Sequence, residues 1–259
     1  MSSATFSISK ALELGQFVLA AYDLFTANDP PNFVPPGGYN LVSKIYADDI
    51  TDDISDYKVF GFIARSGADV VVAIRGTEDA LEWIIDSLFQ PVPFPYVSAG
   101  RTEQGFTYFY STFHTGADST SPRVLDALRA LTADGTVKTL RITGHSLGSA
   151  LATLLAIDVA GNGVFASPTV YTFASPRVGD KVFAGTYDGL VPDSWRIANA
   201  NDIVTQLPPL FAGYLHVDAE VPINSDDRTK HTVSCWHALR TYLNTLDSSV
   251  ALDADCVPT

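Results

Sequence analysis

The sequence is poor in charge, and basic residues are the scarcer kind. Only 17% of its residues are charged, with 16 Lys and Arg against 29 Asp and Glu, which gives a formal net charge of −13. Nucleic acids and anionic membranes are bound through basic faces, so this balance argues against both as partners. Hydrophobic residues make up 46% of the chain, which indicates a globular protein, and its charge is compatible with neutral substrates.

Long apolar runs are also missing. The longest apolar stretch near the start covers residues 11–25, where Glu13 and Asp23 interrupt it. It is too short to span a bilayer, and its helical spacing predicts an amphipathic core helix instead. No secretory leader, internal repeat or linker is recognisable, and 259 residues lie within the range of one α/β domain.

Cysteine is nearly absent, with Cys235 and Cys256 as its only occurrences. Two interpretations stay open: two free buried thiols, or a disulfide that ties down the C-terminal tail in an oxidising compartment. The disulfide would contribute roughly 3 kcal/mol for a loop of this size. His231 and His237 flank Cys235, but the paired spacing of a zinc site is missing, so we expect no metal.

The rest of the chain alternates short apolar segments with helical ones. The pattern predicts strands at residues 58–65, 70–74, 140–143, 170–173, 196–199 and 214–223, and helices at residues 147–160, 180–187 and 237–246. Residues 66–69 suit a hairpin turn between the first two strands. Alternation of this kind from the middle of the chain onward predicts an α/β fold, with a mostly parallel central sheet and helices on both faces.

A Gly-x-Ser-x-Gly pentapeptide, Gly144 to Gly148, is the first candidate for chemistry. Alone it is weak, because a chain of this composition has roughly a one-in-ten chance of an accidental match. Here it lies between an apolar strand and a long helix, where a nucleophile elbow belongs. The elbow makes Ser146 the candidate nucleophile and the backbone N–H of Leu147 a donor to an oxyanion. The alternative is a serine that merely caps a helix.

The acid and the base should follow the serine in that order along the chain. Asp202 comes just after the predicted strand at residues 196–199, at the edge where active sites of parallel sheets assemble, although it could also be a turn aspartate. Three histidines follow Ser146 outside the elbow, namely His216, His231 and His237.

Several segments together resemble the class 3 lipases, the filamentous-fungal type of lipase and feruloyl esterase with bacterial relatives. The resemblance covers most of the chain from about Tyr57, and it also includes Trp83 and Asp86. The segments are residues 71–77 (VVAIRGT), 143–151 (TGHSLGSAL), 172–179 (TFASPRVG), 196–202 (RIANAND), 214–221 (YLHVDAEV) and 237–243 (HALRTYL).

The resemblance implies an α/β-hydrolase fold, with residues 1–259 as one domain and a lid segment around residues 78–96. It implies that His237 is the catalytic base, with His231 as the alternative, and that His216 is structural. It also implies that Thr77 supplies a second oxyanion donor. Ser146, His237 and Asp202 would then form a catalytic triad.

The function implied is that of a serine carboxylic ester hydrolase, a triacylglycerol lipase that works through an acyl-enzyme and needs no cofactor. The substrate would be a neutral lipid or another ester, met at a lipid–water interface. We expect a monomer without a transmembrane segment, secreted rather than cytoplasmic. The alternatives are a feruloyl or other carboxylesterase, a phospholipase, and a lipase-like binding module without catalysis.

Some positions depart from the family pattern. Glu103 stands where the family often has histidine, before Gly105-Phe106. Ser149, Ala174 and Asp218 replace glycines usual in the family. None of these is a triad residue, so they bear on the shape of the pocket rather than on the chemistry.

Overall fold

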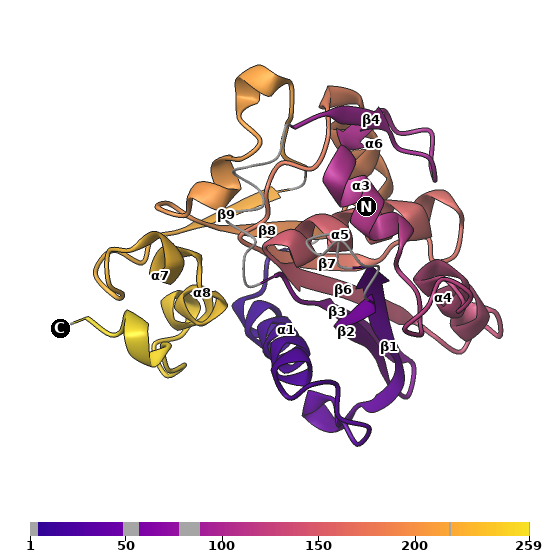
Figure 1. Ribbon diagram of the computed structural model, residues 1–259, viewed down its shortest axis with the longest axis horizontal. Helices are drawn as coiled ribbons and strands as arrows, with labels where there is room; N and C mark the ends of the chain where they lie inside the picture. The colour runs from indigo at the N-terminus through magenta and orange to yellow at the C-terminus, as the bar shows by residue number, and fades with distance from the viewer. Residues whose placement is uncertain (1–4, 49–56, 78–88, 218, 259) are drawn as a thin grey trace.

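A seven-stranded sheet, in the order β1-β2-β3-β6-β7-β8-β9, forms the centre of the computed structural model, which describes residues 5–48, 57–77, 89–217 and 219–258 (Figure 1). The pairs β1–β2 and β2–β3 are antiparallel, and β3, β6, β7, β8 and β9 run parallel to one another. The mostly parallel sheet predicted from the sequence is thereby confirmed. The strands are β1 (Asn40–Asp48), β2 (Tyr57–Ser66), β3 (Asp69–Ile74), β6 (Thr139–His145), β7 (Thr169–Phe173), β8 (Ser194–Asn199) and β9 (Ala219–Ile223).

Helices cover both faces of this sheet. One face carries α1 (Ile8–Thr26) and α8 (Leu239–Leu246), which lie side by side in Figure 1. The other carries α3 (Gln104–Ser111), α4 (Val124–Thr132), α5 (Leu147–Gly161) and α6 (Lys181–Leu190). Smaller elements are the paired strands β4 (Pro91–Pro93) and β5 (Arg101–Glu103), helix α7 (Val233–His237), and the 3₁₀ turns η1 (Pro36–Gly38), η2 (Ile203–Gln206), η3 (Leu210–Ala212) and η4 (Ala254–Cys256).

The strand β3 shows how the sequence specifies two cores. Its alternate residues Val70, Val72 and Ile74 join the core under α5, whereas Val71 and Ala73 join the core under α1. A run of small and β-branched apolar residues is what a strand with two covered faces requires. Over the described ranges, none of the helices is both long and apolar enough to cross a membrane.

Two of the predicted elements differ from the structure. The predicted strand at residues 214–223 forms only from Ala219, because Tyr214 and Leu215 turn to bond Phe89 and Gly179 instead. The predicted helix at residues 237–246 is broken at Ala238, whose φ of −57° and ψ of 131° are not helical. Helical periodicity continues across this break, so the pattern alone could not reveal that His237 ends one helix and Leu239 begins another. The sequence analysis also missed β1, α3 and α4.

The turn from β6 into α5 is too closely packed for side chains at its glycines. A methyl group on Gly144 would lie 2.2 Å from the carbonyl oxygen of Gly148. One on Gly148 would lie 2.4 Å from the carbonyl oxygens of both Ile74 and Arg75. Real Cβ atoms do not come this close to backbone oxygens, so both glycines are required if α5 is to begin against the ends of β3 and β6.

We therefore expect Gly148→Ala to lower the free energy of unfolding by about 3 kcal/mol, since the clash is with backbone that cannot move aside. The matched control is Gly185→Ala in α6, where an added methyl meets nothing within 4 Å. That change should raise the stability by about 0.5–1 kcal/mol through the better helix propensity of alanine. Urea unfolding of both variants measures the contrast, and equal effects would contradict this account of the elbow.

Candidate active site

Three side chains from distant parts of the chain meet at the carboxyl edge of the sheet. His237 Nε2 lies 2.8 Å from Ser146 Oγ, and His237 Nδ1 lies 2.8 Å from Asp202 Oδ2. Ser146 and Asp202 are fully buried. These are the three residues that the sequence analysis proposed as a triad. A carboxylate oxygen accepts hydrogen bonds, so Nδ1 donates to Asp202 and Nε2 is left to accept the Ser146 hydroxyl proton.

The other histidines have different partners. His231, the alternative base, is bonded through Nε2 to the carbonyl oxygen of Asp226 at 2.9 Å. His216 donates from Nε2 to the carbonyl oxygen of Thr205 at 2.8 Å. Neither ring therefore meets Ser146, as His237 does.

Ser146 occupies the strained turn of a nucleophile elbow. Its φ of 57° and ψ of −127° lie outside the regions that side-chain-bearing residues favour, a conformation found where the surroundings hold it in place. The Ser146 N–H donates to the carbonyl oxygen of Phe173 at 3.0 Å. The Ser149 hydroxyl lies 2.8 Å from the carbonyl oxygen of Gly144 and 2.7 Å from that of Phe173. Ser149, which replaces a family glycine, thus bonds to the backbone on both sides of the elbow.

Asp202 is held by more than the histidine. Its Oδ1 accepts from the Val204 N–H at 3.0 Å, which caps η2, and its Oδ2 accepts from the Tyr242 hydroxyl at 2.6 Å. Burial, and then the Asp202 carboxylate, raise the pKa of Tyr242 well above 10, so this hydroxyl stays protonated and donates. The sequence analysis did not find Tyr242, because no local pattern shows that α8 faces the loop after β8.

His145 links the segment after β3, the elbow and the end of α7 through hydrogen bonds. Tyr22 in α1 accepts from the Gly76 N–H at 3.0 Å and donates to His145 Nδ1 at 2.8 Å. On the other side of the ring, Nε2 donates to the carbonyl oxygen of His237 at 2.8 Å. Burial, and then His237, lower the pKa of His145 well below 6.5. The ring is therefore neutral, with one nitrogen accepting and one donating, as these two bonds require.

The segment after β3 lies directly beside the nucleophile. The Arg75 guanidinium is buried against the rings of Phe25 and Phe60, 3.6 and 4.4 Å from their centroids. A methyl group on Gly76 would lie 3.0 Å from Ser146 Cβ, so the next residue, Thr77, begins beside the serine. Thr77 Oγ1 is buried, and no described residue accepts or donates a hydrogen bond to it. Thr77 and Leu147 thus follow the two strand ends that flank the site, where oxyanion donors are needed.

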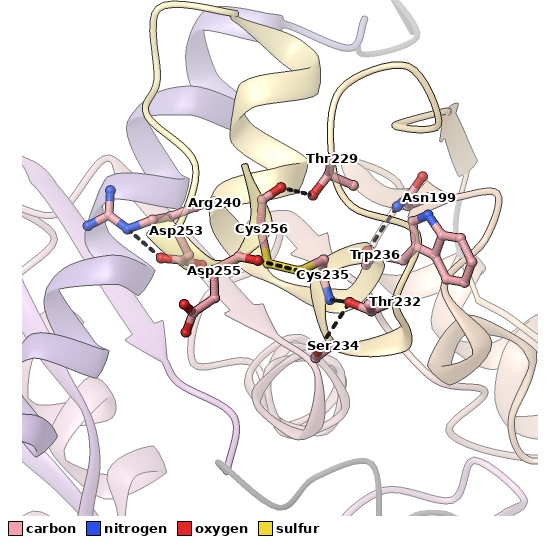
Figure 2. The surroundings of a disulfide bond; sticks show 10 residues. All are labelled: Asn199, Thr229, Thr232, Ser234, Cys235, Trp236, Arg240, Asp253, Asp255 and Cys256. Carbon is pink, nitrogen blue, oxygen red and sulfur yellow. Dashed lines mark hydrogen bonds and ion pairs between the residues drawn. A yellow bond between two sulfur atoms is a disulfide. The ribbon is translucent and has the colours of Figure 1, made fainter. Parts of the chain in front are cut away.

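A disulfide ties the C-terminal tail to the helix that carries the base. Figure 2 shows Cys235 of α7 bonded to Cys256, which settles the two interpretations of the cysteines in favour of the disulfide. The Cys256 carbonyl oxygen accepts from the Thr229 hydroxyl and from the Lys230 N–H, each at 3.0 Å. Arg240 Nε lies 3.2 Å from Asp253. His237 is therefore flanked, at positions 235 and 240, by side chains fixed to the same tail.

The loop that follows Asp202 is fastened by Arg177 of the 172–179 segment. Its guanidinium donates to the carbonyl oxygens of Gln206 and, at 2.9 Å, Pro208. Its N–H donates to the carbonyl oxygen of Leu207 at 2.7 Å. The 172–179 segment matches the family pattern, but the sequence does not show its role. In the structure, Arg177 of this segment fixes the loop that begins at Asp202.

Two of the departures from the family have structural explanations. Glu103 is buried and accepts from the Phe106 N–H at 2.9 Å, so it caps α3, and burial raises its pKa above the usual 4.5. Ala174 adopts a φ of 55°, a left-handed conformation that explains why glycine is usual there. Asp218 lies outside the described residues.

Only residues 89–96 of the predicted lid segment belong to the described residues. Residues 78–88, with Trp83 and Asp86, lie outside the described residues. The remainder of the predicted lid segment is fixed: β4 pairs with β5, and Phe94 is buried against Tyr110 and Phe183. Among the residues that the structure describes, no group of three or more His, Cys, Asp and Glu is arranged to hold a metal ion.

Comparison with known proteins places the chain among lipases and phospholipases of one family. The family model for Lipase (class 3) matches residues 71–212. Phospholipase A1-II 7 of Oryza sativa subsp. indica is 33% identical over 216 residues, covering 71% of this chain and 52% of that protein. The Secreted mono- and diacylglycerol lipase A of Penicillium cyclopium is 32% identical over 190 residues, covering 71% and 59%. The chain thus spans about half the length of the curated relatives it matches.

Solved structures agree with the α/β-hydrolase fold. A mutant form of MDLA from Penicillium cyclopium superposes with a TM-score of 0.66 at 26% identity, covering 89% of this chain and 86% of that one. The Rhizomucor miehei triacylglyceride lipase superposes with a TM-score of 0.67 at 25% identity, covering 85% and 82%.

The surroundings of His216 lead to a prediction about acid stability. Burial, and then Arg196 and Arg177, lower the pKa of His216 from 6.5 to about 3. In the unfolded chain His216 is therefore protonated near pH 6.5, whereas in the folded protein it is protonated only near pH 3. The contribution of neutral His216 to stability is complete above pH 6.5 and falls by about 1.4 kcal/mol for each pH unit below it.

Between pH 6.5 and 5 we expect the wild-type protein to lose roughly 2 kcal/mol more stability than His216→Gln. The glutamine amide can keep the bond to the Thr205 carbonyl without titrating. His231→Gln, at an exposed histidine, should keep the wild-type dependence. Urea unfolding at the two pH values measures the difference, and parallel curves for wild type and His216→Gln would rule the assignment out.

Proposed function

Since the chain belongs to the class 3 lipase family, we propose that it is a serine carboxylic ester hydrolase that acts on acylglycerols through Ser146, His237 and Asp202. The observation that carries the proposal is the continuous line of hydrogen bonds from Ser146 Oγ through His237 to Asp202, each 2.8 Å long, at a strained elbow. This arrangement costs conformational strain and buries a carboxylate, and nucleophilic catalysis is the chemistry that requires it.

The first half-reaction forms an acyl-enzyme. Ser146 Oγ attacks the ester carbonyl while His237 Nε2 accepts its proton, and the Asp202 carboxylate stabilises the resulting imidazolium. The tetrahedral oxyanion is bound by the N–H of Leu147 and by the N–H and hydroxyl of Thr77. The helix α5 adds the partial positive charge of its N-terminus. His237 then gives the proton to the departing alcohol, and the acyl group stays on Ser146.

The second half-reaction releases the acid. His237 Nε2 takes a proton from water, whose oxygen attacks the acyl carbonyl, and the same donors stabilise the second oxyanion. Collapse of this intermediate returns the proton to Ser146 Oγ and frees the carboxylic acid. No metal or organic cofactor takes part in these steps.

A neutral acylglycerol is the substrate class that we favour. Relatives named as a mono- and diacylglycerol lipase and as a lipase support it, and the net charge of −13 suits an uncharged substrate. Phospholipids are the second candidate, because other relatives are named phospholipase A1. A feruloyl ester is the third candidate. The complete hydrogen-bonded triad argues against a binding module without catalysis.

We also propose that the protein is a secreted monomer that works at a lipid–water interface. The disulfide supports an oxidising compartment, and one relative is named as secreted. A lid in residues 78–96 remains part of this proposal.

The proposal predicts that Ser146→Ala abolishes ester hydrolysis, with at least a 10³-fold loss of kcat on every ester the wild-type protein cleaves. Nitrophenyl esters of increasing chain length, a triacylglycerol emulsion, phosphatidylcholine and a feruloyl ester should be compared, with Ser146→Ala as the blank. We expect the acylglycerol to give the highest kcat/KM. Hydrolysis that persists in Ser146→Ala would remove the serine from the mechanism.

A second prediction concerns the tyrosine behind the acid. Tyr242→Phe removes one of the two donors to Asp202 Oδ2, and a hydrogen bond to a charged group contributes about 1.5–3 kcal/mol. We expect kcat to fall roughly 10- to 100-fold with little change in KM, because Tyr242 does not reach the substrate. Tyr187→Phe is the control, since this buried tyrosine bonds Ser194 at 2.9 Å, away from the triad. Equal kcat values in the two variants would show that Asp202 is oriented without Tyr242.

A further inference from the structure

The turn η3 exposes two neighbouring apolar side chains. Phe211 is 94% exposed and Leu210 60%, and Phe211 is the most exposed large apolar side chain of the described residues. Single exposed apolar residues are common on proteins. Two exposed apolar neighbours at the tip of a loop are less common. A loop that was free to move could bury both of them by a small rotation of the turn.

The loop is not free to move, because its two legs are fastened. The first leg is held by Arg177 through the carbonyl oxygens of Gln206 and Pro208. The second leg is held by Tyr214, which is buried and donates to the carbonyl oxygen of Phe89 at 3.0 Å, and by the Leu215 N–H on Gly179. In Figure 1 the orange chain between β8 and β9 rises from the sheet to a turn at the top of the view. The structure therefore holds the apolar tip out in water.

Charge is missing along the whole loop. From Ile203 to Val217 the sequence contains no Asp, Glu, Lys or Arg, in a chain with 29 acidic and 16 basic residues. Ile203, at the start of the loop, is also exposed. A tip without charge on an acidic protein suits a surface that is itself uncharged, because an anionic membrane would repel the rest of the molecule.

The loop is also continuous with the catalytic edge of the sheet. It begins one residue after Asp202, whose carbonyl oxygen accepts from the Thr205 hydroxyl at 2.8 Å. A surface that binds the tip of the loop therefore also fixes the position of the sheet edge at which Ser146, His237 and Asp202 meet. Phe89, which Tyr214 bonds, lies within the segment predicted as a lid, at the first residue of it that the structure describes.

From these observations we propose that Leu210 and Phe211 anchor the protein on a neutral lipid–water surface by inserting into its outer layer. The inference rests on the proposed function, which supplies such a surface as the substrate. The anchor belongs to the loop between β8 and β9, and its two residues lie outside the predicted lid segment at residues 78–96. It orients the triad toward the surface, and the hydrolysis of dissolved esters does not need it.

The test compares the double variant Leu210→Ser/Phe211→Ser with Val34→Ser, a change at another apolar side chain that is 77% exposed. Flotation with triolein droplets coated with phosphatidylcholine measures binding. Nitrophenyl butyrate below its solubility limit measures the chemistry. Removing the two apolar side chains should weaken binding to the droplets at least about tenfold. Val34→Ser should bind as the wild type does, and all three proteins should cleave the soluble ester within about twofold of one another.

Undiminished binding by the double variant would overturn the anchor, as would stronger binding of the wild type to droplets coated with phosphatidylglycerol. Light scattering after size exclusion gives a further test: a dimer in the wild type that the double variant loses would assign the tip to a second copy of the chain. Failure of the proposed function can be told apart from failure of the anchor. If the proposed function is wrong, the soluble ester is either not cleaved or cleaved without Ser146, and this does not depend on the flotation result.

Discussion

The site depends on one close contact, the packing of the first turn of α5 against the carboxyl ends of β3 and β6. Gly148 meets the carbonyl oxygens of Ile74 and Arg75 with no room for a side chain. Because β3 and β6 are parallel neighbours, with Ile74 opposite Gly144, both strands end at one edge. Thr77 and Ser146 follow these ends within three residues. The positions of the proposed nucleophile and of the proposed oxyanion donors thus follow from the packing of the strand ends.

His237, the proposed base, is positioned by a different means, a series of buried hydrogen bonds that joins segments far apart in the sequence. Tyr22 joins Gly76 to His145, and His145 joins the elbow to the carbonyl oxygen of His237. Each group in this series has a complementary partner only while His145 is neutral, and burial keeps it so. On the other side the disulfide fixes α7. The His237 backbone is therefore held from both sides, and its imidazole keeps both nitrogens for Ser146 and Asp202.

Local pattern was sufficient for much of the fold, and together with the family resemblance it led to the three residues that the structure brings into contact. The apolar runs of β3 and β6 and the helix after Ser146 were visible in the sequence, and the motifs indicated the class 3 lipase family, which the comparisons confirm. Tyr22 lies outside every motif, and it bonds His145, which is 123 residues away in the chain. Tyr242 lies inside the motif at residues 237–243, but its bond to Asp202, 40 residues away, could not be seen in the sequence. The break at Ala238 was hidden by apolar spacing that continues across it. The pairing of the cysteines depended on distance in space, and the sequence left it open.

The position of the disulfide has a consequence for proteolysis. Cys235 and Cys256 enclose α8 and the exposed turn that follows it, and exposed turns are preferred sites of cleavage. After a single cut anywhere between residues 236 and 255, the disulfide still joins the two fragments, and the tail stays bonded to Thr229 and Lys230. A protease could thus cut the chain close to His237 without separating the two fragments. The cleaved protein would migrate as one species until the disulfide is reduced, and as two fragments afterwards.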